Sequence, residues 1–172
     1  MSDDTSGTPL VPHITSEFLL WLWWYSEHRE GLFRLSDPVG DVTLWIDDRL
    51  AFRRPSDSRL TAVMTGDNPS ASLEARAALA GGKVLHELRI GMKRDEREFF
   101  VTLKGPSLHF QATKLPPVVE KGEEEPIHSR LYFYDELALI VGALFQHFGE
   151  LRTSEEWSDV VPLIQAWVAG EQ

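Results

Sequence analysis

Apolar residues crowd the stretch Phe18–Tyr25 and predict a helix that is buried on all sides. Every position in this stretch is aliphatic or aromatic, whereas a helix on a protein surface keeps a polar face. Thr15 and Ser16 are candidates for the N-cap and Gly31 ends the pattern, so the predicted helix spans 15–30. We expect it to pack between two layers or between subunits, rather than to expose its rings for base stacking.

The next segment alternates short apolar runs with turn residues, which predicts strands over 32–35, 42–46, 50–53 and 60–64. Asp47 and Asp48 lie between two of these runs, and we interpret them as a turn rather than as metal ligands. Asn68 and Pro69 begin a predicted helix over 69–80, which Gly81 ends.

Residues 83–92 alternate strictly and predict a strand with one buried face. The even positions are apolar except for His86, so we expect a hydrogen-bonded core histidine there rather than a metal ligand. A turn over 93–97 leads to a predicted strand over 98–103, and another follows over 108–112. These strands predict an antiparallel meander.

The C-terminal part predicts a loop and two helices. The loop spans 116–127 and is acidic, so we expect it to be mobile. Asp135 is a candidate cap for a helix whose apolar residues recur every three or four positions up to Leu151. Thr153 and Glu156 form a candidate capping box for a last helix that stops near Gly170.

These elements predict an α+β fold, in which the aromatic-rich N-terminal helix and two C-terminal helices pack on one face of an antiparallel sheet. The predicted domain spans 14–170, after a flexible tail over 1–13. The chain has 172 residues, is 42% apolar and contains no Cys. That composition is typical of a soluble domain in a reducing compartment and excludes thiolate chemistry. No apolar run is long enough to span a bilayer, so we expect a cytoplasmic protein with no membrane partner.

The net charge of −10 contains a basic middle segment. Between Arg49 and Lys104 there are 11 Lys and Arg against 7 Asp and Glu, a net of +4, which leaves −14 for the rest of the chain. This asymmetry is compatible with a sheet that faces a polyanion, although a solvated surface of mixed charge is its commoner cause.

Motifs of catalysis are absent. The sequence contains no phosphate-binding loop, no hydrolase elbow and no metalloprotease signature. Glu87, Glu98 and Lys104 fall on neighbouring predicted strands, but their spacing matches no nuclease signature. We therefore expect no enzyme, no metal site and no cofactor, and a divergent metal-dependent nuclease is the third-ranked interpretation.

Three segments carry a family resemblance between about Ile14 and Phe148. They are Phe18–Trp24, the hairpin from Ala80 through Phe110, and Arg130–Phe148 with Asp135–Ile140 at its centre. These segments resemble the C-terminal part of the bacterial recombination-associated protein RdgC. The resemblance implies a ring-shaped dimer that binds duplex DNA without sequence specificity, restrains the recombinase RecA by occupying DNA, and associates with the nucleoid.

The residues themselves suggest where DNA would bind. Lys and Arg contact phosphates regardless of base sequence, and the candidates on or near the middle strands are Lys83, Arg89, Lys93, Arg94, Arg97, Lys104, Arg53 and Arg54. A competing interpretation pairs Arg89, Arg94 and Arg97 with the neighbouring acids Glu87, Asp95, Glu96 and Glu98 as surface ion pairs.

A second functional class remains open at this point. The chain is then an acidic protein-interaction or homodimerisation module that does not bind DNA. Its interface would be the aromatic helix over 15–30, through Trp21, Trp23, Trp24 and Tyr25.

Overall fold

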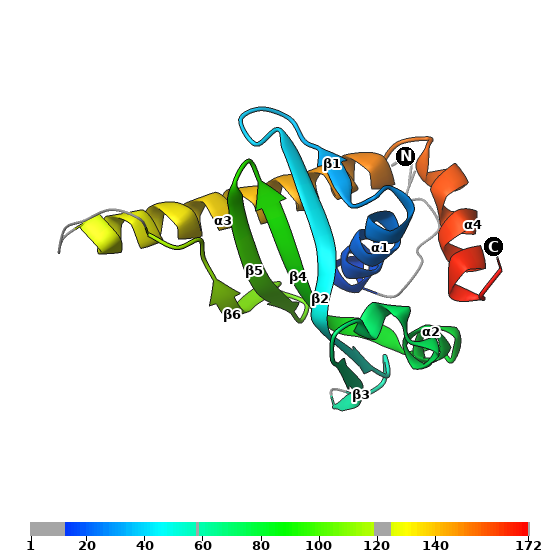
Figure 1. The fold of residues 1–172 in the computed structure, drawn as a ribbon. Coiled ribbons are helices and arrows are strands. Elements are labelled where there is room, and N and C mark those ends of the chain that lie inside the picture. The colour runs from blue at the N-terminus through cyan, green and yellow to red at the C-terminus, as the bar shows by residue number, and fades with distance from the viewer. Residues whose placement is uncertain (1–12, 58, 119–124, 172) are drawn as a thin grey trace.

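Six antiparallel strands form one sheet, and helices cover one of its faces (Figure 1). The computed structural model describes residues 13–57, 59–118 and 125–171. The strands lie in the order β1-β2-β4-β5-β6, and β3 pairs with β2 as well. Their bounds are β1 (Leu32–Arg34), β2 (Asp41–Arg53), β3 (Leu60–Thr65), β4 (Val84–Arg94), β5 (Arg97–Lys104) and β6 (His109–Lys114). The predicted α+β fold is thus confirmed.

Helix α1 (Ile14–His28) is the centre of the core. It contacts β2 and β4 of the sheet as well as α3 (Glu125–Arg152) and α4 (Trp157–Val168). Helix α2 (Leu73–Ala80), which follows a short 3₁₀ turn (Pro69–Ala71), packs against β4 and α4. None of these helices crosses to the other face of the sheet (Figure 1). In the described part of the chain, no helix is long and apolar enough to cross a membrane.

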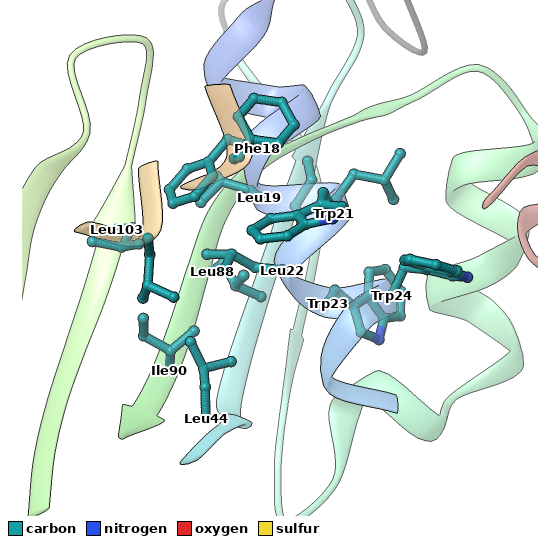
Figure 2. Close-up of a cluster of buried hydrophobic side chains, with 14 of the residues drawn as sticks. Phe18, Leu19, Trp21, Leu22, Trp23, Trp24, Leu44, Leu88, Ile90 and Leu103 are labelled. Atoms are coloured by element: carbon teal, nitrogen blue, oxygen red, sulfur yellow. The ribbon is translucent and has the colours of Figure 1, made fainter. Parts of the chain in front are cut away.

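The aromatic side chains of α1 bind the layers together. In Figure 2, the side chains of α1 gather with Leu44, Leu88, Ile90 and Leu103 of the sheet. The ring of Trp21 lies 5.5 Å from that of Phe33 on β1 and 5.5 Å from that of Phe148 on α3. Trp23 meets Trp167 of α4 edge to face at 4.9 Å. The prediction that this helix is enclosed on all sides is confirmed, and the enclosing layers belong to one chain.

Two predictions about the N-terminal half of the chain are wrong. His13 is the N-cap of α1, and Thr15 and Ser16 lie inside the helix and are buried. Asp47 and Asp48 are not a turn either, because β2 continues through them with an irregular register between Ile46 and Leu50. Residues 1–12, which contain most of the predicted tail, lie outside the described residues.

A bulge changes the predicted alternation of β4. Glu87 pairs with Ala51 and Leu85 pairs with Phe52, so His86 is skipped in the register. Leu85 therefore joins the core, whereas His86 is half-buried. The prediction that His86 lies on the apolar face is wrong for this reason.

The C-terminal helices begin at other places than predicted. Helix α3 starts at Glu125 and runs through Asp135 without a break, so Asp135 caps nothing and the loop ends earlier than residue 127. Most of the remaining loop, residues 119–124, is outside the described residues. Thr153 donates a hydrogen bond to the carbonyl oxygen of Gly149 at the end of α3, and Glu156 alone is the N-cap of α4.

Two glycines provide a matched test of how closely the turn after α1 approaches β2. Both have a positive φ, but a Cβ atom on Gly31 would lie 2.0 Å from the carbonyl oxygen of Leu44, whereas a Cβ on Gly40 meets nothing within 4 Å. We expect Gly40→Ala to cost about 1–2 kcal/mol in the free energy of unfolding, from backbone strain alone. Gly31→Ala should cost about 3 kcal/mol or more, because a backbone clash adds to that strain. Urea unfolding measures both values, and equal costs would contradict the close approach.

Candidate nucleic-acid interface

Four of the eight predicted phosphate contacts meet at one end of the sheet. Arg53 pairs with Val84 on one side and with Leu60 on the other, so Arg54 and Lys83 lie just past the last paired residues. Lys104 is the last residue of β5 and lies opposite Glu87. We call this region the basic end and define it as Arg53, Arg54, Arg59, Lys83, His86 and Lys104.

Most cations of the basic end have no acidic partner among the residues that the structure describes. Arg53, Arg54, Arg59 and Lys83 form no ion pair with an acid in the described part of the chain, and all four are exposed or half-exposed. Asp57, in the turn between β2 and β3, accepts a hydrogen bond from the backbone N–H of Arg59 at 2.9 Å. The guanidinium and ammonium groups therefore remain open to solvent and to an anion.

The pKa of His86 is affected by the positive charges around it. Partial burial lowers the pKa of its imidazole, and the charges of Arg53 and Lys104 lower it further, against the opposing effect of Glu87. Its backbone carbonyl accepts a hydrogen bond from the N–H of Gly105 at 3.0 Å, which fixes the turn after β5 beside the bulge. The side chain is thus a neutral group at pH 7 among cations.

Glu87 is the buried acid that borders the basic end. Its carboxylate is 3% exposed and accepts from Arg49 Nε at 2.9 Å, while Lys104 Nζ lies 3.3 Å away. Burial acts to raise the pKa of this carboxyl, but Arg49 and Lys104 outweigh burial and hold the pKa below its ordinary value. Lys104 therefore pairs with a buried acid of the sheet, but its side chain is still 37% exposed and also belongs to the basic end.

Arg89 is committed to contacts within the sheet. Its Nε lies 3.0 Å from Asp47 and 3.4 Å from Asp48, and its Nη1 donates to the carbonyl oxygen of Ala112 at 2.7 Å. Its guanidinium also lies over the ring of Phe100. These contacts explain why β2 keeps two adjacent aspartates in mid-strand, and they remove Arg89 from the set of free cations.

Arg94 and Arg97 join the β4–β5 hairpin to α3. Each places a terminal nitrogen 2.6 Å from Glu136, whose side chain is buried, and Arg94 also donates to the carbonyl oxygens of Pro38 and Val39. Glu136 raises the pKa of Arg97 above its ordinary value. Both arginines are therefore structural, at the end of the hairpin opposite the basic end. Lys93 is exposed beside them, across from Glu98.

The competing interpretation is correct that these arginines form ion pairs, but its acids are wrong for Arg89 and Arg94. Arg89 pairs with Asp47 and Asp48, and Arg94 pairs with Glu136, none of which is a sequence neighbour. Among the neighbouring acids, only Asp95 approaches Arg97, at 3.9 Å and with an exposed carboxylate.

The aromatic helix does not provide an interface. Trp21 and Trp23 are fully buried, Trp24 is 6% exposed, and Tyr25 stacks on Phe33 at 4.3 Å. The predicted interface through Trp21, Trp23 and Trp24 is wrong, because their rings fill the core of their own chain, and Tyr25 packs half-buried against that core.

Some residues of the site were missed in the sequence. Arg59 follows the turn after β2, and pairing 50–53 with 60–64 as a hairpin would have placed it opposite Arg54. Nothing in the sequence indicates Glu136 as the partner of Arg94, since 42 residues separate them. Within the described residues, no group of three or more His, Asp or Glu is placed to hold a metal ion.

The chain was compared with known families, proteins and structures. No family model, no curated protein and no solved structure matches it. The class of protein is therefore defined by its own architecture. It is an α+β protein with helices on one face of an antiparallel sheet and a cluster of free cations at one end of that sheet.

The charge pairs of Glu87 predict a pH-dependent stability. Because its folded-state pKa is depressed, the pairs stabilise the fold above the ordinary carboxyl pKa, and the stabilisation is lost as the pH falls through the folded-state value. We expect Glu87→Gln to lower the free energy of unfolding by about 1–3 kcal/mol at pH 7 and by less near pH 3. Chemical unfolding at both pH values measures this. The control is Glu98→Gln, which changes an exposed acid on β5. A loss for Glu87→Gln that does not depend on pH would contradict the account.

Proposed function

We propose that the protein binds duplex DNA without sequence specificity, through the basic end of the sheet, and that it acts by occupancy rather than by catalysis. The observation that carries this proposal is a set of cations that pair with no acid among the described residues, namely Arg53, Arg54, Arg59 and Lys83, gathered on adjacent strand ends. Arg and Lys bind phosphate oxygens and release the counterions of DNA, which supplies affinity irrespective of the bases.

The distribution of the remaining charges supports a local site. Arg89, Arg94 and Arg97 pair with four acids, Asp47, Asp48, Glu136 and Asp95, so the positive potential is concentrated at the cations that have no acidic partner among the described residues. A net charge of −10 keeps the rest of the surface repulsive toward DNA. Binding through one end of the sheet is compatible with that net charge, whereas wrapping of DNA around the whole surface is not.

The resemblance of the sequence to RdgC supports the same class of ligand. By that resemblance, the proposed role is the restraint of recombination by occupying duplex DNA, in association with the nucleoid. The lack of a catalytic motif in the sequence agrees with a binding role.

Removing three cations of the basic end tests the proposal against a matched control. The test variant is Arg53→Gln/Arg54→Gln/Lys83→Gln. The control is Arg29→Gln/Arg34→Gln/Lys93→Gln, which removes three exposed cations elsewhere and leaves the same net charge. The dissociation constant for a labelled duplex is measured by fluorescence anisotropy at about 50 and 200 mM salt.

We expect the test variant to bind at least about tenfold more weakly, and its log–log salt slope to be shallower by about 0.9 for each phosphate contact removed. The control should retain most of the affinity. If the unaltered protein does not bind at the lower salt, or both variants lose affinity equally, the proposal is wrong.

A further inference from the structure

A row of paired residues crosses the face of the sheet that is turned away from the helices (Figure 1). We call it the aromatic row, and it consists of Trp45 on β2, Gly91 on β4, Phe100 on β5 and Lys114 on β6, each paired with the next. Side chains at paired positions project from the same face of a sheet. Their neighbours along the strands, such as Leu44, Ile90 and Val101, are buried in the core on the other face. No helix of the described chain covers the aromatic row.

Gly91 allows the ring of Trp45 to lie flat on the sheet. A Cβ atom on Gly91 would lie 2.3 Å from Cε2 of the indole, 2.4 Å from Nε1 and 2.5 Å from Cζ2. Cε2 is bonded to the other two atoms, and it would not be the nearest of the three if the edge of the ring met Gly91. The indole therefore turns one face to the glycine and the other face away from the sheet. A side chain at position 91 would displace the ring.

Trp45 differs from the other tryptophans of the chain in its exposure. The sequence contains six Trp, and five of them are at most 6% exposed, namely Trp21, Trp23, Trp24, Trp157 and Trp167. Trp45 is half-buried instead. Its outer face is a large, flat and apolar surface that is supported from below by the backbone of β4. Such a surface is suited to stacking with a planar ligand.

The groups beside the indole favour a planar ligand that carries a negative charge. Phe100 meets Trp45 edge to face, with the ring centres 5.8 Å apart. Nζ of Lys114 lies 5.4 Å from the centre of the Phe100 ring. Lys114 is exposed and forms no ion pair with an acid in the part of the chain that the structure describes.

The acids on this face are matched by other cations. Asp47 and Asp48 pair with Arg89, and Glu87 pairs with Arg49 and Lys104. Asp41 and Glu98 lie opposite Arg34 and Lys93 in the register of the sheet. Lys114 is therefore the cation beside the two rings that is available to an anion.

We infer that the aromatic row binds single-stranded RNA, with a base stacked on the outer face of Trp45 and a neighbouring phosphate held by Lys114. Every nucleobase has a flat π face, so stacking on an aromatic side chain tolerates any sequence. The bases of a duplex stack on one another and offer no free face to a sheet, so the ligand must be unpaired. This binding is independent of the duplex binding proposed for the basic end.

Unpaired bases and ribose hydroxyls favour RNA as the occupant. RNA presents unstacked bases in its loops and ends, and aromatic side chains on the open face of a sheet are a common means of binding them. Thr43 lies two positions before Trp45 on β2, and Gln111 pairs with Thr102 of β5. Thr43 and Gln111 are exposed on the face of the aromatic row. Their hydroxyl and amide groups can form hydrogen bonds with a base edge or with the 2′-hydroxyl, which DNA lacks.

The fluorescence of the unaltered protein tests the stack on Trp45. The probe is a uridine oligoribonucleotide of about eight residues, a length typical of one single-strand site. Because the other five indoles are enclosed, saturation with this RNA should quench the part of the emission that comes from Trp45. Trp45→Phe should abolish the quenching. RNA that fails to bind, or that binds without quenching, would overturn the inference.

Anisotropy of the same RNA, labelled with a fluorophore, measures the contribution of the ring. Trp45→Ala should weaken binding by about tenfold or more, and Trp45→Phe should recover part of the affinity because it restores a ring. Tyr132→Ala is the matched control, since it removes an aromatic side chain that is 63% exposed on α3. If Trp45→Ala is folded by circular dichroism and binds like this control, the inference is wrong.

The salt dependence of RNA binding tests the role of Lys114. Lys114→Gln should make the log–log salt slope shallower by about 0.7, which is the value for one phosphate of a single strand. Arg29→Gln removes an exposed cation elsewhere and should leave the slope unchanged. Equal slopes for the two variants would contradict the phosphate contact.

Two other nucleic acids decide between the possible occupants. A deoxyuridine oligonucleotide of the same length lacks the 2′-hydroxyls and should bind more weakly; equal binding would overturn the assignment to RNA. Duplex DNA should bind Trp45→Ala as it binds the unaltered protein. RNA that fails to bind would therefore leave the proposed duplex binding standing, and a duplex that fails to bind would leave the RNA site standing.

Discussion

The enclosure of α1 is the constraint on which the rest of the structure depends. Its residues from Phe18 to Trp24 are buried on every side of the helix, and such a helix is stable in water only when other elements surround it completely. The sheet encloses one side, and α3 and α4 enclose the others. Helices α1, α3 and α4 consequently all lie on one face of the sheet (Figure 1). The opposite face of the sheet and its ends are not covered by these helices (Figure 1).

Buried acids then decide which cations remain available. Glu17 pairs with Arg152 between α1 and the end of α3, Glu136 holds Arg94 and Arg97, and Glu87 holds Arg49 and Lys104. A buried carboxylate without a partner would be costly, so each of these acids requires a cation from a distant part of the chain. Among the described residues, the cations at the turn after β2 and at the start of β4 pair with no buried acid. This uneven neutralisation, rather than the net charge, locates the candidate interface.

The sequence predicts the parts of this fold that are set by local pattern. The continuous apolar run of α1 and the alternation of β4 and β5 are strong signals. A helix buried on all sides has apolar residues at every position, and a strand buried on one face has them at every second position. The irregularities at Asp47 and His86 are different, since a bulge depends on what the partner strands do. The start of α3 was missed because Pro126 and the acids before it are typical of a loop, although proline is tolerated in the first turn of a helix. Only four of the eight predicted phosphate contacts lie at the basic end. The structural role of Arg94 and Arg97 could not be predicted, because their pairing with Glu136 is a long-range contact.

Hydrogen–deuterium exchange of the protein with and without a duplex of random sequence tests the central claim most directly. If enclosure of α1 leaves the basic end as the DNA surface, the duplex should slow exchange in residues 53–60, 83–87 and 104–106. The hairpin end over 93–97, where the arginines are held by Glu136, should not change. Protection of the hairpin end without protection of the basic end would contradict the account, as would protection confined to α1.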